Sequence, residues 1–439
     1  MADQDTPHIA FKKIERRPYS FLLDSAAGRS KLAARSFMGS DPFLVFKSKR
    51  NSVTLEWAEG NTERLKANPF VVLKDLLKRF KTKAVKAGAP FIAGAVGYFG
   101  YDMKDLLEKL PDIAKDDIGL ADCIIGFYDK IAVYNSRRCN TGSCNTGSCD
   151  RFNAPELRSN FTKEAYIKTV NRAKEYIKKG DIYQVNLSQR FESRLDMEPY
   201  ELYLRLRDFS PAPFSSYLNF GDCAVISSSP ERFLMKQGSY IETRPIKGTR
   251  PRSKDPMMDG FNRNELVKSY KDRAEHIMIV DLERNDLGRI CEYGSVKPTE
   301  FIALERYPNV FHLVSTISGK LRKDIDPIDC LTATFPGGSI TGAPKIRSME
   351  IIEELEPVKR GIYTGAIGYI SFDGNMDTSI AIRTMLVKGK KLYFQAGGGI
   401  VADSDPESEY AETLDKARGM LQAIGIEGNR EITSSLRGR

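Results

Sequence analysis

The sequence predicts an α+β protein with a largely antiparallel sheet. Strand-like runs follow one another directly, as at residues 223–228 and 232–236, and helical segments do not alternate with them. A parallel α/β sheet needs a crossover helix between successive strands. The observed order of patterns therefore favours the α+β class.

The first third of the chain carries short strand patterns and one amphipathic helix. Strands are predicted at residues 43–47 and 52–57, and a helix at 71–79. The segment at residues 91–102 reads FIAGAVGYFGYD, with glycines set among apolar residues. This pattern is typical of a strand with close backbone approach that ends in a turn.

The pattern is clearest after residue 160. Thr162 is placed to cap a helix over 163–179, and Gly180 is placed to end it. Residues 181–191 read DIYQVNLSQRF and alternate like a strand with two different faces. The buried stripe of the helix is predicted to consist of Ile167, Val170, Ala173 and Ile177.

The remaining elements are predicted from the same signals. Helices are expected over 271–285, after Pro344 and after Pro406. Further strands are expected at residues 365–372, 379–387 and 391–395. The last of them is expected to end before the glycines of QAGGGIVADSDP.

A tandem CNTGS repeat at residues 139–149 marks the best domain boundary. It separates an N-terminal region, 1–155, from a catalytic domain, 156–428, and a C-terminal tail, 429–439. The repeat carries Cys139, Cys144 and Cys149, whose spacing of five differs from that of common zinc sites. We assign this repeat no function. The other four cysteines stand singly, as buried free thiols do.

The composition is ordinary for a soluble globular protein, and it favours neither a membrane protein nor a nucleic-acid-binding protein. No apolar run in the 439 residues is long enough to span a bilayer and the start lacks a signal peptide, so a cytoplasmic location is expected. The net charge is +9, but the basic residues are interleaved with acidic ones. A nucleic-acid-binding protein would cluster them with aromatic residues. A solvated surface accounts for the positive net charge, and an anionic substrate accounts for it equally well.

Two predicted helices each present acidic side chains on one face. Asp272 and Glu275 are three residues apart on one helix, and Glu409, Glu412 and Lys416 share a face of another. Such pairs are commonly exposed salt bridges. Together, two such faces are also able to hold one hard cation such as Mg²⁺.

Two glycine-rich segments and three single residues are further candidates. FPGGSITGAPKIRSMEII sets a loop before a helix, where backbone N–H groups bind anions, and QAGGGIVADSDP permits close approach to its backbone. Both segments are also readable as turns.

Lys247 stands among arginines in PIKGTRPR and is either a nucleophile or a basic loop residue. Arg383 lies in an apolar strand pattern and needs an anionic partner. His312 is an acid or base, or a core residue.

A set of motifs, in order, resembles the chorismate-utilising enzymes. This family includes anthranilate synthase component I, aminodeoxychorismate synthase component I, isochorismate synthases and salicylate synthases. The similar segments cover nearly all of the chain from residue 160 and comprise GYFGYD, GDIYQVNLSQRF, SSSPERF, PIKGTRPR, AEHIMIVDLERND, HLVSTISG, FPGGSITGAPKIRSMEII, YTGAIGYI, TSIAIRT and QAGGGIVADSDPESEYAETLDKA. The resemblance implies two large, largely antiparallel sheets packed as a sandwich with flanking helices.

The resemblance also implies roles for particular residues. Glu275 and Glu412 would bind Mg²⁺, supported by Asp272 and Glu409, and the metal would hold the ring carboxylate of chorismate. Glu231 would act as acid and base at the C4 hydroxyl, and His312 would orient the reacting region. The substrate contacts would be Arg383, Tyr363, Gly397, Gly399, Lys416, Ser339, Thr341 and Gln184.

Two positions narrow the reaction within the family. Members that add water usually carry Lys where this chain has Gln184, so Gln184 implies amination. Anthranilate synthases usually read PIAGTRPR, whereas PIKGT resembles the aminodeoxychorismate synthases, in which this Lys forms a covalent intermediate. The resemblance therefore implies amination of chorismate at C4 through Lys247, for p-aminobenzoate and folate synthesis. Anthranilate synthase component I is the alternative, and a non-catalytic relative is disfavoured by the full set of catalytic residues.

The resemblance implies partners as well. The chain shows no glutaminase signature, so ammonia is expected from a separate glutamine amidotransferase subunit. The N-terminal FLLDSAAG resembles a tryptophan-binding LLES segment of the family, with Asp24 in place of Glu. Tryptophan is therefore a further ligand implied near Ser25.

Overall fold

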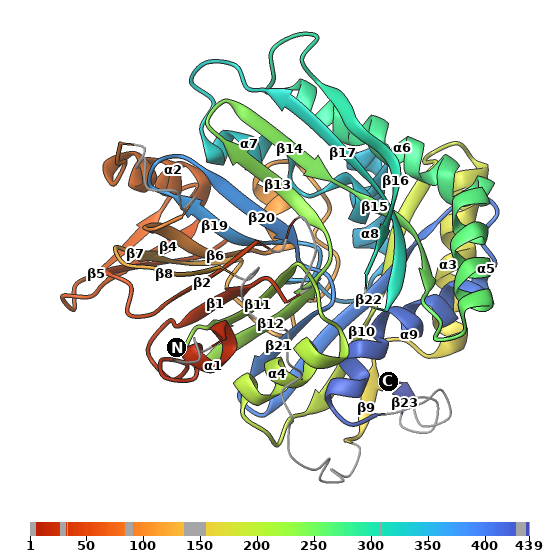
Figure 1. Ribbon diagram of the computed structural model, residues 1–439, viewed down its shortest axis with the longest axis horizontal. Coiled ribbons are helices and arrows are strands. Elements are labelled where there is room, and N and C mark those ends of the chain that lie inside the picture. Colours follow the sequence, from red (N-terminus) through yellow and green to blue (C-terminus); the bar gives the residue numbers. More distant parts are fainter. Residues whose placement is uncertain are drawn as a thin grey trace.

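Two large β-sheets form the centre of the protein (Figure 1). The structure is a computed structural model and describes residues 6–26, 32, 34–83, 91–135, 155–307, 309–426 and 436–438. The CNTGS repeat lies outside these described residues. Cys123, Cys223, Cys291 and Cys330 are buried free thiols, as the sequence predicted.

The first sheet, called the A sheet, has 11 strands among the described residues, and all of these pair in antiparallel fashion except β23 with β9. In spatial order it contains β23 (Leu436–Gly438), β9 (Leu157–Ser159), β10 (Gln184–Arg194), β22 (Lys391–Ile400), β21 (Thr384–Lys388), β12 (Cys223–Ser229), β11 (Phe214–Asn219), β1 (Phe21–Asp24), β2 (Arg35–Gly39) and β8 (Ala132–Asn135). The short β18 (Gly342–Ala343) pairs with β10.

The second sheet, called the B sheet, has 12 strands in antiparallel pairs within the part of the chain that the structure describes. In spatial order it contains β15 (Ile246–Pro251), β17 (Val310–Lys320), β14 (Tyr240–Arg244), β13 (Arg232–Gln237), β20 (Met376–Ile380), β19 (Ala366–Ser371), β6 (Gly94–Phe99), β7 (Cys123–Tyr128), β3 (Leu44–Lys49), β4 (Ser52–Trp57) and β5 (Thr62–Lys66). A further strand, β16 (Lys297–Arg306), pairs with β17. Each of the two sheets contains strands from before residue 155 and strands from after it.

The two sheets pack against each other through apolar side chains. Phe21 and Val225 of the A sheet share one buried cluster with Val96 and Ile367 of the B sheet. Burial of such side chains is the main favourable term in folding. The predicted α+β sandwich is therefore confirmed.

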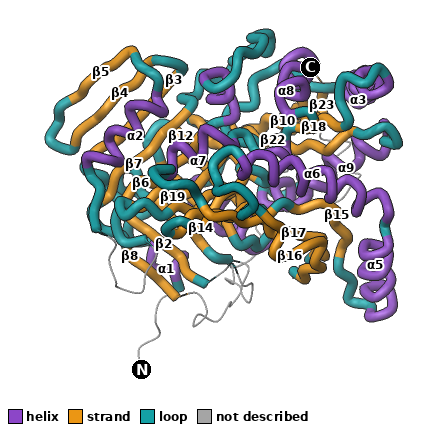
Figure 2. Tube along the Cα trace, turned by 90° about the horizontal axis from the view of Figure 1, so that it is seen from above, coloured by secondary structure: helices purple, strands orange, loops and turns teal. Residues whose placement is uncertain are grey.

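Helices gather on one side of the molecule, next to β10, β15 and β22 (Figures 1 and 2). This group comprises α3 (Lys163–Lys178), α5 (Pro256–Lys268), α6 (Tyr270–Gly288), α8 (Lys345–Leu355) and α9 (Pro406–Ala423). Elsewhere lie α1 (Pro7–Phe11), α2 (Pro69–Arg79), α4 (Pro199–Phe209) and α7 (Pro327–Thr334). Among the described residues, no helix combines the length and apolar character needed to cross a membrane.

Helix α3 begins as predicted but buries a different stripe. The Thr162 hydroxyl accepts a hydrogen bond from the Ala165 N–H at 3.1 Å, which is an N-cap. The fully buried residues include Tyr166 and Tyr176, whereas the predicted Ile167 and Ile177 are only half-buried. Large aromatic rings bury more surface than isoleucine and so take the central positions.

The predicted strand 181–191 begins later and has no solvent face. It is β10, which starts at Gln184, and its residues are buried on both faces as far as Phe191. The strand lies inside the A sheet between β22 and β9, and helices α3 and α8 pack against it. Polar side chains on this strand therefore lie in the interior.

The predicted strand 379–387 is wrong, because it is two strands in different sheets. β20 ends in the B sheet, and β21 begins in the A sheet after three connecting residues, Ala381 to Arg383. Arg383 has φ +53°, a left-handed conformation that interrupts a strand. The chain crosses between layers here, which leaves the arginine in a connection rather than in a strand.

Candidate active site

Two carboxylates of α9 lie over the glycine-rich part of β22, and a third, on α6, lies within electrostatic range of one of them. Glu275 lies on α6, and Glu409 and Glu412 lie on α9. A Cβ atom placed on Gly398 would lie 3.1 Å from Glu409 Oε2 and 3.4 Å from Glu412 Oε1. The charge of Glu412 contributes to the raised pKa of both other carboxyl groups.

These carboxylates are short of hydrogen-bond donors. Burial is the main cause that raises the pKa of Glu275 and of Glu409. Glu409 Oε1 accepts a hydrogen bond from the Ser404 hydroxyl at 2.6 Å, but its buried Oε2 has no hydrogen-bond partner among the residues that the structure describes. Glu412 lies 2.6 Å from the Lys416 ammonium group, which lowers its pKa. Carboxylate oxygens are the ligands that a hard cation prefers, and the unpartnered Oε2 of Glu409 fits such a ligand.

Asp272 is placed differently from the other acids. Its Oδ2 accepts a hydrogen bond from Arg250 Nη2 at 3.0 Å, and its carboxyl lies beside Gly248. Within the described ranges, no group of three or more His, Cys, Asp and Glu side chains is arranged as a metal-binding cluster. Mg²⁺ usually keeps several waters and few protein ligands, so Mg²⁺ binding stays a prediction.

Lys247 is on β15 and reaches across to the A sheet. A Cβ atom placed on Gly399 would lie 3.3 Å from Lys247 Nζ. Burial lowers the pKa of Lys247, and the positive charge of Lys416 lowers it further, against the opposing effects of Glu275 and Glu231. A larger fraction of this amine is therefore neutral and nucleophilic than for a surface lysine.

Gln184 lies beside Lys247 and is unusual for a buried amide. Its side chain is 1% exposed, and within the described part of the chain neither the amide oxygen nor the amide nitrogen has a hydrogen-bond partner. A Cβ atom on Gly399 would lie only 2.2 Å from Gln184 Nε2. Buried polar atoms are normally satisfied, so an unpaired amide here indicates a place for a polar ligand.

Glu231 follows β12 and is positioned by the glycine-rich loop. Ser339, in the 3₁₀ turn Gly338–Ile340, donates a hydrogen bond to Glu231 Oε1 at 2.7 Å. Burial raises the pKa of Glu231 to about 7, although Ser339 and Lys247 oppose the shift. This carboxyl group therefore carries a proton for much of the time at neutral pH and is able to donate or accept one.

Thr341 makes its hydrogen bonds within the same loop and to the neighbouring strand β10. Its hydroxyl donates to the carbonyl oxygen of Gly337 at 3.0 Å and is fully buried. The backbone oxygen of Thr341 accepts a hydrogen bond from the Asn186 N–H at 2.8 Å. Thr341 therefore fixes the loop to β10, whereas Ser339 presents a hydroxyl to Glu231.

His312 is buried on β17 and is neutral. Its Nδ1 lies 2.8 Å from the Thr249 hydroxyl on β15. Burial, with a smaller effect from the charge of Arg383, lowers its pKa to about 4. At neutral pH the ring is therefore able to orient or polarise a neighbour but carries no positive charge.

Arg383 lies within electrostatic range of both Tyr363 and Glu412. Burial lowers the pKa of Arg383 to about 10, opposed by Tyr363 and Glu412, and raises the pKa of Tyr363. The Arg383 guanidinium donates to the carbonyl oxygen of Lys416 on α9. No carboxylate among the described residues forms an ion pair with Arg383, so its charge is left for an anion.

The three glycines do not follow the strand as predicted but lie within it. β22 continues to Ile400, and Gly397, Gly398 and Gly399 pair with β10. A Cβ atom on Gly397 would lie 2.4 Å from the Leu187 carbonyl oxygen, so glycine is needed for this close pairing. The Gly397 carbonyl oxygen accepts a hydrogen bond from Lys416 Nζ at 2.8 Å.

One acidic residue behind the loop was missed by the sequence analysis. Glu283 Oε1 accepts a hydrogen bond from the Gly338 N–H at 3.0 Å, and Glu283 is 3% exposed. Burial and the neighbouring Asp286 raise its pKa to about 7. Glu283 lies eight residues after Glu275 on α6, and this helical spacing was the signal available.

A separate cavity borders the N-terminal segment. It has a volume of about 270 Å³, and Asp24, Ser25 and Phe214 are among its lining residues. The Asp24 carboxylate already accepts hydrogen bonds from Arg207 Nε at 2.8 Å and from the Tyr203 hydroxyl at 2.9 Å. Tryptophan binding near Ser25 stays a prediction.

Comparison with known proteins shows which family the chain matches and which proteins it is similar to. The chorismate binding enzyme family matches the chain over residues 19–422. An anthranilate synthase component 1 from Acetivibrio thermocellus is 39% identical over 461 residues, covering 96% of this chain and 93% of that protein. An aminodeoxychorismate synthase component 1 from Escherichia coli is 40% identical over 438 residues, covering 96% of both chains.

The fold is similar to a solved structure of the first kind of protein. The crystal structure of anthranilate synthase component I from Streptococcus pneumoniae matches with a TM-score of 0.77 and 30% identity. The match covers 96% of this chain and 98% of that chain. Relatives of two reaction types are therefore about equally similar to the chain.

Proposed function

Because this chain belongs to the chorismate binding enzyme family, we propose that it aminates chorismate at C4 to give 4-amino-4-deoxychorismate, a precursor of p-aminobenzoate and folate. The family makes it an enzyme that acts on chorismate. The choice of amination at C4 rests on one observation, the half-buried Lys247, whose amine lies beside Gln184 and Gly399 and has a pKa lowered by desolvation.

In the proposed reaction Lys247 is a transient nucleophile. Its neutral amine attacks C2 of chorismate, both ring double bonds shift (C1=C2 to C1=C6 and C5=C6 to C4=C5), and the C4 hydroxyl leaves as water after it has been protonated. The Lys247 nitrogen gives up one proton, which replaces the proton given to the hydroxyl. Ammonia then attacks C4, both double bonds shift back, and the Lys247 amine leaves C2 with a proton that balances the one lost by the ammonia nitrogen.

Glu231 is proposed to supply the proton for the departing hydroxyl. Its pKa of about 7 leaves a substantial protonated fraction at neutral pH, and the Ser339 hydroxyl holds its Oε1 in place. A general acid works best when its pKa lies near the operating pH. His312, neutral and buried, is proposed to orient the reacting part of the substrate.

Gln184 supports ammonia rather than water as the second nucleophile. A water molecule needs a general base, which an amide is unable to provide, whereas ammonia carries its own lone pair. The unpaired amide atoms of Gln184 are available to orient ammonia or a substrate oxygen. We propose that a partner glutamine amidotransferase supplies this ammonia.

Two groups of residues are proposed to hold the two carboxylates of chorismate. Arg383 and Tyr363, with the backbone at Gly397 and Gly399 and with Lys416 nearby, would bind one of them. Glu275 and Glu412, supported by Asp272 and Glu409, would hold Mg²⁺ beside the ring carboxylate. The bound ion would supply positive charge that offsets the negative charges gathered there.

The pH dependence of the reaction follows from Glu231. Because burial raises its pKa, the acid is protonated below about pH 7 and loses its proton above it. We expect kcat/KM for chorismate, measured at a fixed concentration of free ammonia, to fall about tenfold per pH unit above this pKa. The Glu231→Gln variant should be slower, and its kcat/KM should not fall above this pH. If kcat/KM of the variant falls in the same way, a group other than Glu231 causes the fall.

Gly399→Ala should block the site by shape alone. The new Cβ atom would lie 2.2 Å from Gln184 Nε2 and 3.3 Å from Lys247 Nζ, so both side chains would have to move. We expect kcat/KM for chorismate to fall about 10²-fold or more, since such displacements of reacting groups are costly. Gly260→Ala on α5 is the matched control, because a Cβ atom there meets nothing within 4 Å. Equal activity of both variants would place the substrate elsewhere.

Product identification tests the proposed function directly. The purified chain is incubated with chorismate, Mg²⁺ and ammonium, and the products are separated by chromatography with mass detection. A product one mass unit lighter than chorismate, which an added lyase converts to p-aminobenzoate, is the expected result. Fluorescent anthranilate with release of pyruvate would instead identify an anthranilate synthase.

A further inference from the structure

Arg360 is a buried arginine whose donors are all in use. It is 4% exposed, and it follows α8 in the connection to β19. Each of its five N–H groups donates one hydrogen bond: Nε to Glu356 Oε2 at 2.8 Å, Nη1 to the Ile340 oxygen at 3.1 Å and to Thr364 Oγ1 at 3.2 Å, and Nη2 to the Asn186 oxygen at 2.8 Å and to Glu356 Oε1 at 2.7 Å. A guanidinium offers five donors in a fixed plane, and no other side chain does so.

The acceptors come from separate segments that surround the proposed site. Ile340 belongs to the loop that presents Ser339, and Asn186 lies two residues from Gln184 on β10. Glu356 extends the network, because its Oε1 also accepts hydrogen bonds from the N–H of Ser188 at 2.8 Å and from its hydroxyl at 3.0 Å. One guanidinium therefore connects the loop, β10 and the end of α8.

Arg360 also shapes the turn that carries Tyr363. Thr364 has φ +62°, which is a strained conformation for a β-branched residue. Its hydroxyl accepts from Arg360 and donates to the Tyr363 carbonyl oxygen at 2.5 Å. The guanidinium lies 5.6 Å from the Tyr363 ring centre. The strained turn thus depends on Arg360 for one of its side-chain contacts.

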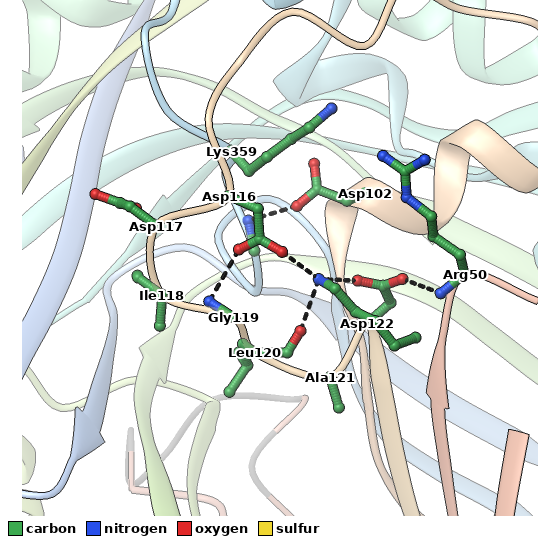
Figure 3. A network of polar contacts seen from close by, with 12 residues as sticks. Arg50, Asp102, Asp116, Asp117, Ile118, Gly119, Leu120, Ala121, Asp122 and Lys359 are labelled. Atoms are coloured by element: carbon green, nitrogen blue, oxygen red, sulfur yellow. Dashed lines mark hydrogen bonds and ion pairs between the residues drawn. The ribbon is translucent and has the colours of Figure 1, made fainter. Parts of the chain in front are cut away.

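The GYFGYD motif supports the same turn from the N-terminal part of the chain. The guanidinium lies 4.7 Å from the Tyr101 ring centre. The Tyr101 N–H donates to the Gly361 oxygen at 2.7 Å, and the Gly361 N–H donates to Asp102 Oδ2 at 2.9 Å. Figure 3 shows Asp102 beside the loop that contains Asp116 and Asp122. This motif therefore holds the turn next to Arg360 rather than the substrate.

From this network we infer that Arg360 is a positioning residue for the chorismate site. It sets the relative places of Ser339, Gln184 and Tyr363 through the five hydrogen bonds, without touching the substrate itself. The inference rests on the proposed site but not on which amino product is formed. The positioning role depends on the planar guanidinium with its five N–H donors and not on the positive charge alone. A lysine would keep the charge but offer only three donors from one atom.

The test compares Arg360→Lys with a matched buried arginine. Arg190, 5% exposed, pairs with both oxygens of Asp117 and lies 5.6 Å from the Tyr393 ring centre. It borders the same cavity as Arg360, but its side-chain hydrogen bonds go to Asp117 and not to the Ser339 loop or to the Tyr363 turn. We expect Arg360→Lys to lower kcat/KM for chorismate about 10²-fold, with kcat affected as well as KM. Arg190→Lys should stay within a few-fold of the wild type at a similar loss of thermal stability.

Chemical rescue separates positioning from simple loss of structure. Arg360→Ala leaves a space for a small planar cation, so methylguanidine at non-denaturing concentrations should restore part of kcat, whereas methylammonium should not. Activity is followed as loss of chorismate, so a different product would overturn the proposed reaction and leave this inference standing. Wild-type activity of Arg360→Lys would overturn the inference. Equal losses in Arg190→Lys without rescue would also overturn it.

Discussion

Replacing Lys247 by alanine should lower the rate of chorismate amination by about 10³-fold or more. The variant removes the proposed nucleophile, and no other amine replaces it, because the neighbouring Lys416 is engaged by Glu412 and by the Gly397 oxygen. Binding should survive, since the substrate carboxylates are assigned to other residues. Calorimetric titration with chorismate and Mg²⁺ should therefore give a dissociation constant within a few-fold of the wild type.

Lys254→Ala is the matched control for this prediction. Lys254 is exposed and lies seven residues further along the chain, beyond β15. Its removal should leave turnover unchanged. Mass spectrometry of the intact wild-type protein with chorismate and no ammonia should detect an adduct with the mass of chorismate less one water. Full turnover by Lys247→Ala, or an adduct that persists in this variant, would exclude the covalent role of Lys247.

Glu275→Gln should abolish the response of the enzyme to Mg²⁺. A neutral amide removes one of the two carboxylates assigned to the metal, and Mg²⁺ binds amides poorly compared with carboxylates. Turnover at saturating chorismate should fall by at least about 10²-fold. The measurement is the rate as a function of Mg²⁺ concentration, with direct Mg²⁺ titration as a second readout.

The same substitution should not destabilise the fold. Burial raises the pKa of Glu275, so the folded protein holds this carboxylate at a cost, and a neutral isostere removes that cost. The melting temperature without Mg²⁺ should therefore be unchanged or higher. Asp281→Asn is the control, because Asp281 lies on the same helix in an exposed ion pair with Arg284. A wild-type Mg²⁺ response in Glu275→Gln would refute the metal assignment.

Local signals in the sequence determined most helices and several strands of this protein. Helix α3 begins at its Thr162 cap, and α9 begins at Pro406, as predicted. The strand β4 has the predicted bounds. These features depend on residues close in the chain, namely caps, prolines and short periodic runs, and such interactions are visible in the sequence. The motifs also named the residues that gather around Gly399.

Only the tertiary structure decided where long-range contacts overrule those signals. The run 379–387 looks like one strand, yet it divides between two sheets, because pairing with β13 and β12 outweighs local pattern. Arg360 has one acidic partner close in the chain, Glu356 four residues before it, but its acceptors Ile340 and Asn186 lie 20 and 174 residues away. Hydrogen-bond satisfaction inside a packed core is settled by partners that meet only after folding. The residues proposed for the site were therefore predicted from the sequence, whereas the network that positions them became visible only in the structure.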